Sequence, residues 1–188
     1  EVDVPLGDVK GVTKGEGQLA GPVEWETAKG SLPLVLGGDQ RIAIGTLAGV
    51  AKDDQNLGVI WFDAHGDINT AETSPSGNIH GMSLAVSLGF GDSILTEVGG
   101  YSPKIKPENV VIIGARELDE GEKQLIKKIN MRVYTMHEID RLGMTRVMEE
   151  TIEYLKSRTD GVHLSLDLDG LDPHDEPGVG TPVLGGIN

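Results

Sequence analysis

The chain alternates short apolar runs with longer segments in which apolar residues recur at helical spacing. Apolar runs of this length predict buried strands, and a spacing of three to four residues predicts amphipathic helices. Strands are expected at residues 31–38, 58–63, 109–114, 131–134 and 162–169. Helices are expected at residues 41–51, after Asp39 as N-cap, and at 80–89, 119–129 and 145–159, with shorter ones at 92–98 and 135–142. Residues 1–31 are Gly-rich and weakly periodic, which predicts a loop with an edge strand at 2–6 and a short helix at 22–29.

Strands separated by helices favour right-handed crossovers and a mostly parallel sheet that is covered on both faces. The predicted fold class is therefore α/β. A chain of this length can form one domain with a sizeable core or two small ones, and one domain over residues 1–188 is expected. In such sheets ligands bind beyond the carboxyl ends of the strands. The predicted loop at residues 68–79, rich in Thr, Ser, Pro, Gly and Asn, follows one of these ends.

Composition narrows the class of protein. Hydrophobic residues make up 38% and charged residues 24%, which is ordinary for a soluble globular protein. A net charge of −14 argues against a nucleic-acid partner, because no basic patch is available for phosphates. The absence of Cys excludes disulfides and thiolate chemistry, and no apolar run approaches the roughly 20 residues that span a bilayer. These features predict a cytoplasmic enzyme. The start at Glu1 rather than Met predicts a processed product or a fragment.

Two predicted strands end in clusters of metal-ligating side chains. Asp63, His65 and Asp67 follow one apolar run at every second position, and Asp167 and Asp169 follow another. A carboxylate at the edge of a core needs a cation or a hydrogen-bond network. Helix capping is the alternative explanation, but two such clusters favour a site for two divalent ions. Carboxylates with one imidazole suit Mn²⁺ or Mg²⁺, and two such ions can activate water as a nucleophile.

The remaining histidines differ in context. His80 lies in a Ser- and Gly-rich loop after the metal-ligand strand, and its ordinary pKa near 6.5 suits a group that carries protons to solvent. His137 and His163 are interpreted as structural, and His174 is a weaker candidate in the loop after the last strand. The Gly pair at residues 37–38 lacks the Gly-Lys-Ser/Thr of a phosphate-binding loop.

Several segments resemble the signature motifs of the ureohydrolases, the arginase and agmatinase group. These segments are LVLGGDQ, WFDAHGDINT, SGNIHGM and SLDLDGLDPHDEPGVGTPV, and the resemblance runs from about residue 32 to residue 187. SGNIHG and IGARELDEGE are more similar to the arginases, in particular those of bacilli. The resemblance implies a three-layer α/β/α sandwich, a trimer or a dimer of trimers, and hydrolysis of L-arginine to L-ornithine and urea by a hydroxide that bridges two Mn²⁺ ions.

The resemblance also implies roles for individual residues. The implied metal ligands are Asp63, His65, Asp67, Asp167 and Asp169. His80 corresponds to the proton-shuttle histidine, and Asp67 would also pass a proton to the leaving amine. The positions that match substrate contacts are Asn69, Ser74 and Ser76 at the carboxylate, Asp119 and Glu122 at the α-amino group, and Thr181 in the pocket wall.

The chain departs from the family pattern in two places. Gln40 stands where the family has a metal-binding His. Because an amide is a poorer ligand than imidazole, one of the two Mn²⁺ ions should bind weakly or be absent. The chain also stops at Asn188, whereas family members continue and supply a Glu to the guanidinium. A fragment or a reduced variant is therefore expected. The alternatives are another ureohydrolase such as an agmatinase, and a relative without catalytic activity.

Overall fold

The computed structural model describes residues 9–52 and 56–188. Two compact units make up the chain, and both are discontinuous in sequence. The first unit comprises residues 1–55 and 67–106, and the second comprises residues 56–66 and 107–188. The predicted edge strand at residues 2–6 lies outside the described residues.

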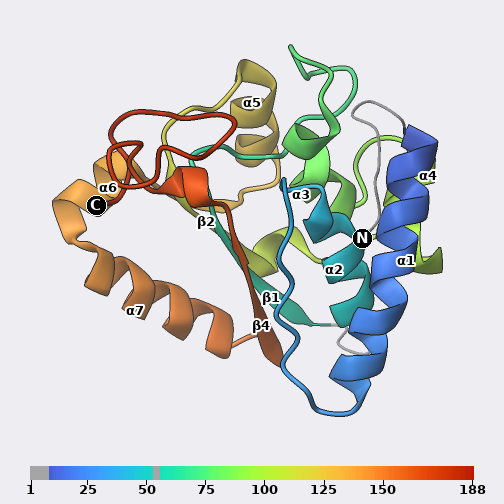
Figure 1. Cartoon of the computed structure of the whole chain (residues 1–188). Coiled ribbons are helices and arrows are strands. Elements are labelled where there is room, and N and C mark those ends of the chain that lie inside the picture. Colours follow the sequence, from blue (N-terminus) through green and yellow to red (C-terminus); the bar gives the residue numbers. More distant parts are fainter. Residues whose placement is uncertain (1–8, 53–55) are drawn as a thin grey trace. The chain divides into compact units, whose positions relative to one another are not determined.

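The second unit is built on a parallel sheet, as the alternation of apolar runs and helical segments predicts (Figure 1). Its strands are β1 (Leu57–Phe62), β2 (Val110–Ala115), β3 (Arg132–Thr135) and β4 (Gly161–Leu166). The order across the sheet is β3-β2-β1-β4, and every neighbouring pair is parallel. The α/β fold class and these four strands are confirmed. Strand β1 therefore lies between β2 and β4, and the carboxyl ends of these three parallel strands lie at the same end of the sheet.

The helices of the second unit follow its strands. They are α5 (Glu120–Lys128), α6 (Met136–Leu142) and α7 (Met144–Lys156), with short 3₁₀ turns η3 (Pro107–Asn109) and η4 (Leu168–Gly170). Both α5 and α6 begin with a capping box, in which the N-cap side chain and a glutamate three residues later satisfy each other's backbone N–H groups. The buried positions of α7 recur every fourth residue, so one face of this helix joins the core. That core contains Ile60, Val111, Ile113, Tyr134, Ile139, Val147 and Leu155.

Strand β4 has a neighbouring strand on one side only, among the residues that the structure describes. Its alternate residues Val162, Leu164 and Leu166 are 51%, 56% and 52% exposed. They belong to the same face of the sheet as Ile60, which is buried, because Ile60 pairs with Leu164 in the parallel register. Apolar side chains and the free edge of the sheet are thus exposed together at β4.

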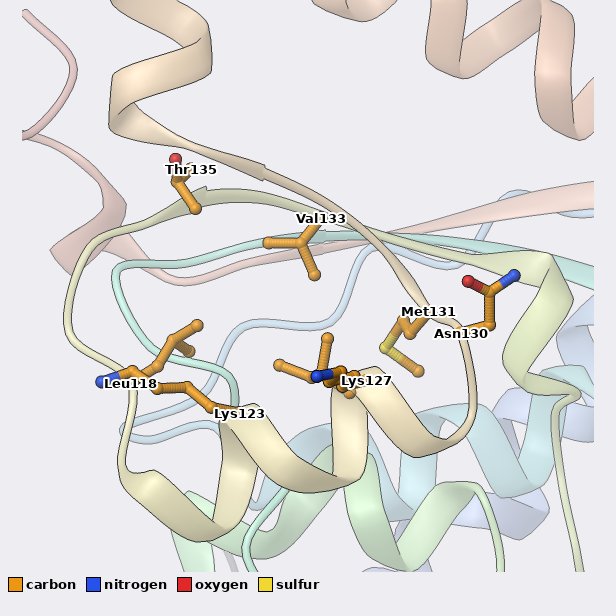
Figure 2. Close-up of a pocket in the computed structure, with 8 residues that line it drawn as sticks. Leu118, Lys123, Lys127, Asn130, Met131, Val133 and Thr135 are labelled. Atoms are coloured by element: carbon orange, nitrogen blue, oxygen red, sulfur yellow. The ribbon is translucent and has the colours of Figure 1, made fainter.

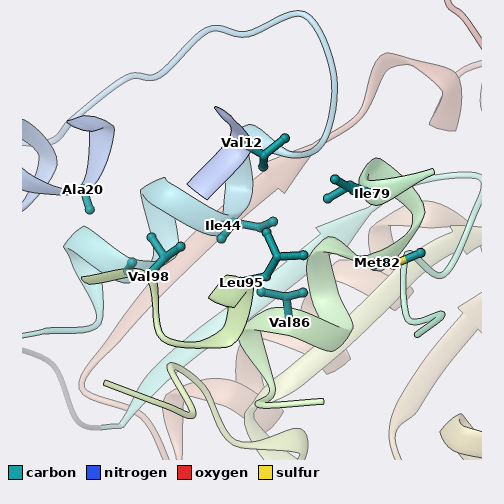
Figure 3. Close-up of a cluster of buried hydrophobic side chains, with 9 residues drawn as sticks. Val12, Ala20, Ile44, Ile79, Met82, Val86, Leu95 and Val98 are labelled. Atoms are coloured by element: carbon teal, nitrogen blue, oxygen red, sulfur yellow. The ribbon is translucent and has the colours of Figure 1, made fainter. Parts of the chain in front are cut away.

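The first unit is helical. Its elements are α1 (Val9–Ala28), α2 (Ile42–Val50), η1 (Ile79–Met82), α3 (Ser83–Ser87), α4 (Ser93–Thr96) and η2 (Val98–Gly100). Their apolar side chains meet in a cluster that contains Val12, Ile44, Met82, Val86 and Leu95 (Figure 3). The helices predicted at residues 41–51, 80–89 and 92–98 are confirmed, the second of them with a 3₁₀ start. No helix in the described parts of the chain combines the length and the apolar character needed to cross a membrane.

Helices α1 and α2 approach closely because α2 carries two glycines on the contact face. A Cβ atom at Gly45 would lie 2.6 Å from the backbone oxygen of Glu16, and one at Gly49 would lie 2.6 Å from the backbone oxygen of Ala20. Neither backbone could yield at that distance, so only glycine fits at these two positions.

The prediction for the start of the chain was wrong over its described part. Residues 9–28 form one long helix rather than a loop followed by a short helix. Four glycines and Pro22 lie in this helix, so its intrinsic helical propensity is poor. Packing compensates, because Val12, Ala20 and Val23 are buried, and helices in proteins gain most of their stability from such contacts.

The strand predicted at residues 31–38 is also wrong. The segment has no regular secondary structure, and Leu32, Leu34 and Leu36 are 96%, 84% and 83% exposed. A strand requires a hydrogen-bonding neighbour, and no described strand pairs with this segment. After it, Asp39 accepts a hydrogen bond from the Arg41 N–H at 2.9 Å, so Asp39 orders the turn, and α2 begins at Ile42 without a side-chain cap.

Candidate metal centre

The carboxyl ends of β1 and β4 bring two ligand-bearing loops together in the second unit. The Asp63 N–H donates to the Ile113 carbonyl at 3.0 Å, and the Asp167 N–H donates to the Phe62 carbonyl at 2.9 Å. The ladder therefore extends one residue past β1 and β4. Gly114 has a φ of +101° and lies so close that a Cβ atom there would be 3.1 Å from the Asp63 carbonyl oxygen. The local backbone thus fixes where both loops begin.

Three side chains converge beyond these strand ends. The His65 Nδ1 atom lies 3.0 Å from Asp169 Oδ2 and 3.3 Å from Asp63 Oδ1. One ligand atom from each of the three residues lies within 4.8 Å of the other two. Asp63 and Asp169 are buried, and His65 is half-buried. The structure therefore confirms that the two predicted clusters meet, through Asp63 and His65 from one and Asp169 from the other.

Burial and mutual proximity shift the pKa values of all three groups. Burial raises the pKa of Asp63, and the nearby charges of Asp169 and Asp167 raise it further. Burial lowers the pKa of His65, but hydrogen bonds to Asp169 and Asp63 outweigh it and raise the pKa to about 11. Burial raises the pKa of Asp169, but the His65 hydrogen bond and charge and the Ala64 N–H lower it overall. The proximity of the two carboxyl groups thus favours a positive charge beside them, which is why the pKa of His65 is raised.

The donor set fits a divalent cation. Oδ2 of Asp63 is buried and has no hydrogen-bond partner in the described structure. An unsatisfied buried carboxylate oxygen carries a large desolvation cost, which a bound cation would remove. Two carboxylates and one imidazole are ligands that Mn²⁺ and Mg²⁺ accept. Asp63, His65 and Asp169 would hold such an ion, with His65 in its neutral form.

Asp167 and Thr181 support Asp169 rather than joining the three-residue group. Oδ1 of Asp167 accepts a hydrogen bond from the Asp169 N–H at 3.0 Å and so caps η4. The Thr181 hydroxyl donates to Asp169 Oδ2 at 2.9 Å. The Ala64 N–H donates to Asp169 Oδ1 at 3.2 Å, so both oxygens of this carboxylate are held.

Comparison with known proteins identifies the family of this chain. The model of the arginase family matches residues 2–188. This chain belongs to the arginase family. An arginase of Bacillus caldovelox is 69% identical over 185 residues, which cover 98% of this chain and 62% of that protein. An arginase of Bacillus subtilis is 67% identical, with coverage of 99% and 62%. The chain thus spans less than two thirds of the length of these relatives.

Solved arginase structures share the fold. The structure of Bacillus caldovelox arginase at pH 5.6 superimposes with a TM-score of 0.95 and 70% identity, and it covers 96% of this chain and 60% of its own. The structure of Entamoeba histolytica arginase in complex with L-ornithine gives a TM-score of 0.91 at 36% identity, with coverage of 99% and 66%. The α/β fold of this chain is therefore an arginase fold.

The other predicted residues of this arginase-family chain fall partly in the first unit. Asp67 is buried with a φ of +49°, and its backbone carbonyl accepts hydrogen bonds from the N–H groups of Leu84 and Ala85. Few residues other than glycine adopt such a φ, and those that do are enriched at functional sites. His80 lies half-buried in η1. Asp67 and His80 are thus held by the backbone that begins α3.

Asn69, Ser74 and Ser76 lie in the loop at residues 68–78, which is ordered by its own side chains. Asn69 is buried, and its side-chain oxygen accepts a hydrogen bond from the Thr73 hydroxyl at 2.9 Å. The Ser74 and Ser76 hydroxyl oxygens accept hydrogen bonds from the backbone N–H groups of residues 77 and 78. The prediction of an ordered polar loop is confirmed.

Asp119 and Glu122 lie at the start of α5 in the second unit. They form its capping box, in which the Asp119 N–H donates to Glu122 Oε2 at 2.8 Å. Glu122 is buried, and a Cβ atom at Gly66 would lie 2.9 Å from its Oε1 atom. Because Gly66 directly follows His65, the structure places Glu122 beside the loop that carries Asp63 and His65.

Two residues near the centre were missing from the predicted set. Glu117 Oε2 lies 3.5 Å from the Nε2 atom of His65. The other ring nitrogen of His65, Nδ1, faces Asp63 and Asp169. Arg116 donates hydrogen bonds to the backbone of the loop that holds Asp169. The sequence indicates these two residues only by their position, because both directly follow the apolar run of β2.

A shallow hollow of about 300 Å³ lies elsewhere in the second unit, between α5 and β3 (Figure 2). Its lining includes Lys123 and Lys127 of α5 and Val133 of β3. It contains none of Asp63, His65 and Asp169, so the hollow is separate from the candidate metal centre.

Proposed function

We propose that this chain carries the metal-dependent hydrolytic centre of an arginase, which converts L-arginine and water to L-ornithine and urea. The observation that supports this most is the convergence of Asp63, His65 and Asp169, with one buried carboxylate oxygen unpaired, in a chain of the arginase family. The chain spans about 62% of the length of its Bacillus relatives.

Mn²⁺ is the proposed metal, and Asp67 and Asp167 are proposed to complete the ligand set. When bound, the ions supply Lewis acidity that makes water a nucleophile at neutral pH. Asp63 and Asp169 contribute the negative charge that attracts the ions, and Thr181 and Ala64 hold Asp169 in one orientation. Fixed ligand orientation raises metal affinity, because less freedom is lost on binding.

The residues around the ligands are proposed to bind substrate and move protons. Asp67 would accept a proton and return it to the leaving amine, and His80 would exchange a proton with solvent. The ordered loop carrying Asn69, Ser74 and Ser76 would donate hydrogen bonds to the substrate carboxylate. Asp119 and Glu122 would contact the α-ammonium group, and Thr181 would line the same pocket. By resemblance, the active assembly would be a trimer or a dimer of trimers.

A second candidate is a relative that binds one metal ion and lacks catalytic activity. Gln40 supports it, because this buried side chain is an amide at a position where the family has imidazole. A third candidate is an agmatinase, which acts on the same guanidinium group without the substrate carboxylate. The loop at residues 69–78 favours arginine over agmatine, because it offers hydroxyl and amide donors.

Metal counting and a urea assay on the same sample distinguish these candidates. We expect native mass spectrometry to detect bound Mn²⁺, and urea to be released from L-arginine but not from agmatine. Asp63→Asn should abolish both metal binding and urea release, whereas Glu153→Gln, on the exposed face of α7, should leave both unchanged. Urea from agmatine alone would replace the arginase proposal with the agmatinase one. Bound metal without urea from either substrate would favour the non-catalytic relative.

A further inference from the structure

We propose that Arg116 is the positioning residue of the metal centre, fixing the loop that carries Asp169 relative to the loop that carries Asp63 and His65. This inference rests on the proposed function, because it concerns the same centre. Arg116 follows β2 at its carboxyl end and is half-buried. Its role would be exercised through backbone atoms, since its guanidinium contacts carbonyl groups and not the ligand side chains.

The guanidinium of Arg116 donates to five backbone carbonyls. Its Nη2 atom donates to the carbonyls of Asp169, Leu171 and Val183 at 2.6, 3.1 and 2.7 Å. Its Nη1 atom donates to the carbonyls of Gly170 and Gly114 at 3.2 and 3.3 Å. Its Nε atom donates to the Val183 carbonyl at 3.1 Å. Three of these carbonyls belong to consecutive residues, 169 to 171. The planar fork of an arginine presents five donors in fixed directions, which no other side chain provides. Arg116 therefore determines the path of the chain through Asp169.

The backbone of Arg116 is joined to the other ligand loop. Its N–H donates to the carbonyl of Ala64 at 2.9 Å, and Ala64 lies between Asp63 and His65. The Ala64 N–H in turn donates to the Asp169 carboxylate. Arg116 thus holds one ligand loop through its main chain and the other through its side chain. Removal of the fork would free the carbonyls of residues 169–171 and let the Asp169 carboxylate move away from His65.

Arg116 also holds the segment that contains Thr181, through its hydrogen bonds to the Val183 carbonyl. Both Nε and Nη2 of Arg116 donate to the Val183 carbonyl, two residues after the threonine whose hydroxyl holds Asp169 Oδ2. Segments 169–171 and 181–183 are therefore attached to one guanidinium. Loss of Arg116 would therefore release both the backbone around Asp169 and the segment whose Thr181 hydroxyl donates to the Asp169 carboxylate.

Charge and positioning predict opposite effects of removing this arginine. A guanidinium close to a cation site repels the cation, so loss of its positive charge alone would strengthen metal binding. If Arg116 acts by positioning, metal binding weakens even though a repulsive charge is removed. Arg116→Lys retains the charge and loses the fork, whereas Arg116→Met loses both. Comparison of the two variants therefore separates electrostatics from geometry.

The test measures Mn²⁺ affinity of the whole chain by competition with a fluorescent chelator. We expect at least tenfold weaker binding for both Arg116→Lys and Arg116→Met, and unchanged binding for Arg146→Met, which removes a charge from the exposed face of α7. Hydrogen exchange of the Gly170, Leu171 and Asp172 amides, measured with chelator present, should be at least tenfold faster in Arg116→Lys. If Arg116→Met fails to fold, Arg116→Lys decides by the same two measurements.

Affinity within twofold of the parent chain in folded Arg116→Lys, or tighter binding by Arg116→Met, would overturn the inference. So would unchanged exchange of the three loop amides. If the parent chain binds no Mn²⁺, the proposed function fails, and the exchange measurement still decides whether Arg116 fixes the loop. The failure of one proposal is therefore distinguishable from the failure of the other.

Discussion

Glu16 should make the first unit less stable as the pH rises. This residue lies in the middle of α1, and its Oε2 atom accepts a hydrogen bond from the Gly45 N–H of α2 at 3.1 Å. Burial raises its pKa to about 7, although the Gly45 N–H and the charge of Arg41 act in the opposite direction. No cation forms a salt bridge with Glu16 within the described residues. Its charged form is therefore poorly compensated where α1 meets α2.

The raised pKa of Glu16 determines how the stability of the fold changes with pH. The folded state binds the Glu16 proton more tightly than the unfolded state, whose pKa is the ordinary 4.5. The free energy of unfolding therefore falls as the pH rises from about 4.5 and levels off above about 7. At about 1.4 kcal/mol per pKa unit, full burial would give about 3 kcal/mol. Because the side chain is partly exposed, solvent screening reduces the expected loss to about 1–2 kcal/mol.

The substitution Glu16→Gln removes the titration and keeps an oxygen that can accept the Gly45 N–H. Urea unfolding followed by circular dichroism, with chelator present and at several pH values between 4.5 and 8, measures the effect. The variant and the parent chain should be equally stable near pH 4.5. Above pH 7 the variant should be more stable by about 1–2 kcal/mol, since it carries no buried charge.

Glu149→Gln provides the matched control, because Glu149 is exposed on α7 in the second unit. Its stability should follow that of the parent chain, apart from a constant offset, at every pH. A difference between Glu16→Gln and the parent chain that does not change with pH would refute the reasoning. The same holds for a parent chain that becomes more stable relative to this variant as the pH rises.

Two further predictions concern the same unit. Gly45→Ala should lower the free energy of unfolding by about 2 kcal/mol, because its Cβ atom would meet the Glu16 backbone at 2.6 Å. Gly17→Ala, with open space around its Cβ atom, should instead add about 0.5–1 kcal/mol, and equal effects in urea melts would contradict the close approach of α1 and α2. Gln40→His should raise the number of Mn²⁺ ions bound and any urea-forming activity. Unchanged metal occupancy in native mass spectrometry would show that something other than residue 40 limits the site.

The sheet and the ligand cluster could be predicted because both depend on strong local patterns. Apolar runs such as the one at residues 58–63 are short, bounded by turns and followed by carboxylates. Parallel strands place their carboxyl ends at one edge, so Asp63 and Asp169 were expected to meet although about a hundred residues separate them. The choice of Asp169 rather than Asp167 as the nearer ligand depends on the turn at η4, which spacing alone does not reveal.

The errors arose where distant parts of the chain determine the outcome. Residues 9–28 look unlike a helix because four glycines and a proline lie among them, and packing against α2, α4 and η2 stabilises that helix. The run at residues 31–38 has the composition of a buried strand, but composition cannot supply the neighbouring strand that it needs. The contacts of Arg116 could not be predicted for a related reason, since most of its carbonyl partners lie more than fifty residues away.

The central place of β1 in its sheet has a consequence for synthesis on the ribosome. Leu57 pairs with Gly161, so β1 emerges roughly a hundred residues before β4, or about 5–20 s at ordinary translation rates. During that interval Val59 and Trp61, which are fully enclosed in the folded chain, have no completed sheet to enter. Non-local pairing of this kind slows folding and favours aggregation or capture by chaperones. The cluster of Asp63, His65 and Asp169 can therefore form only after β4 and the residues that follow it have been synthesised.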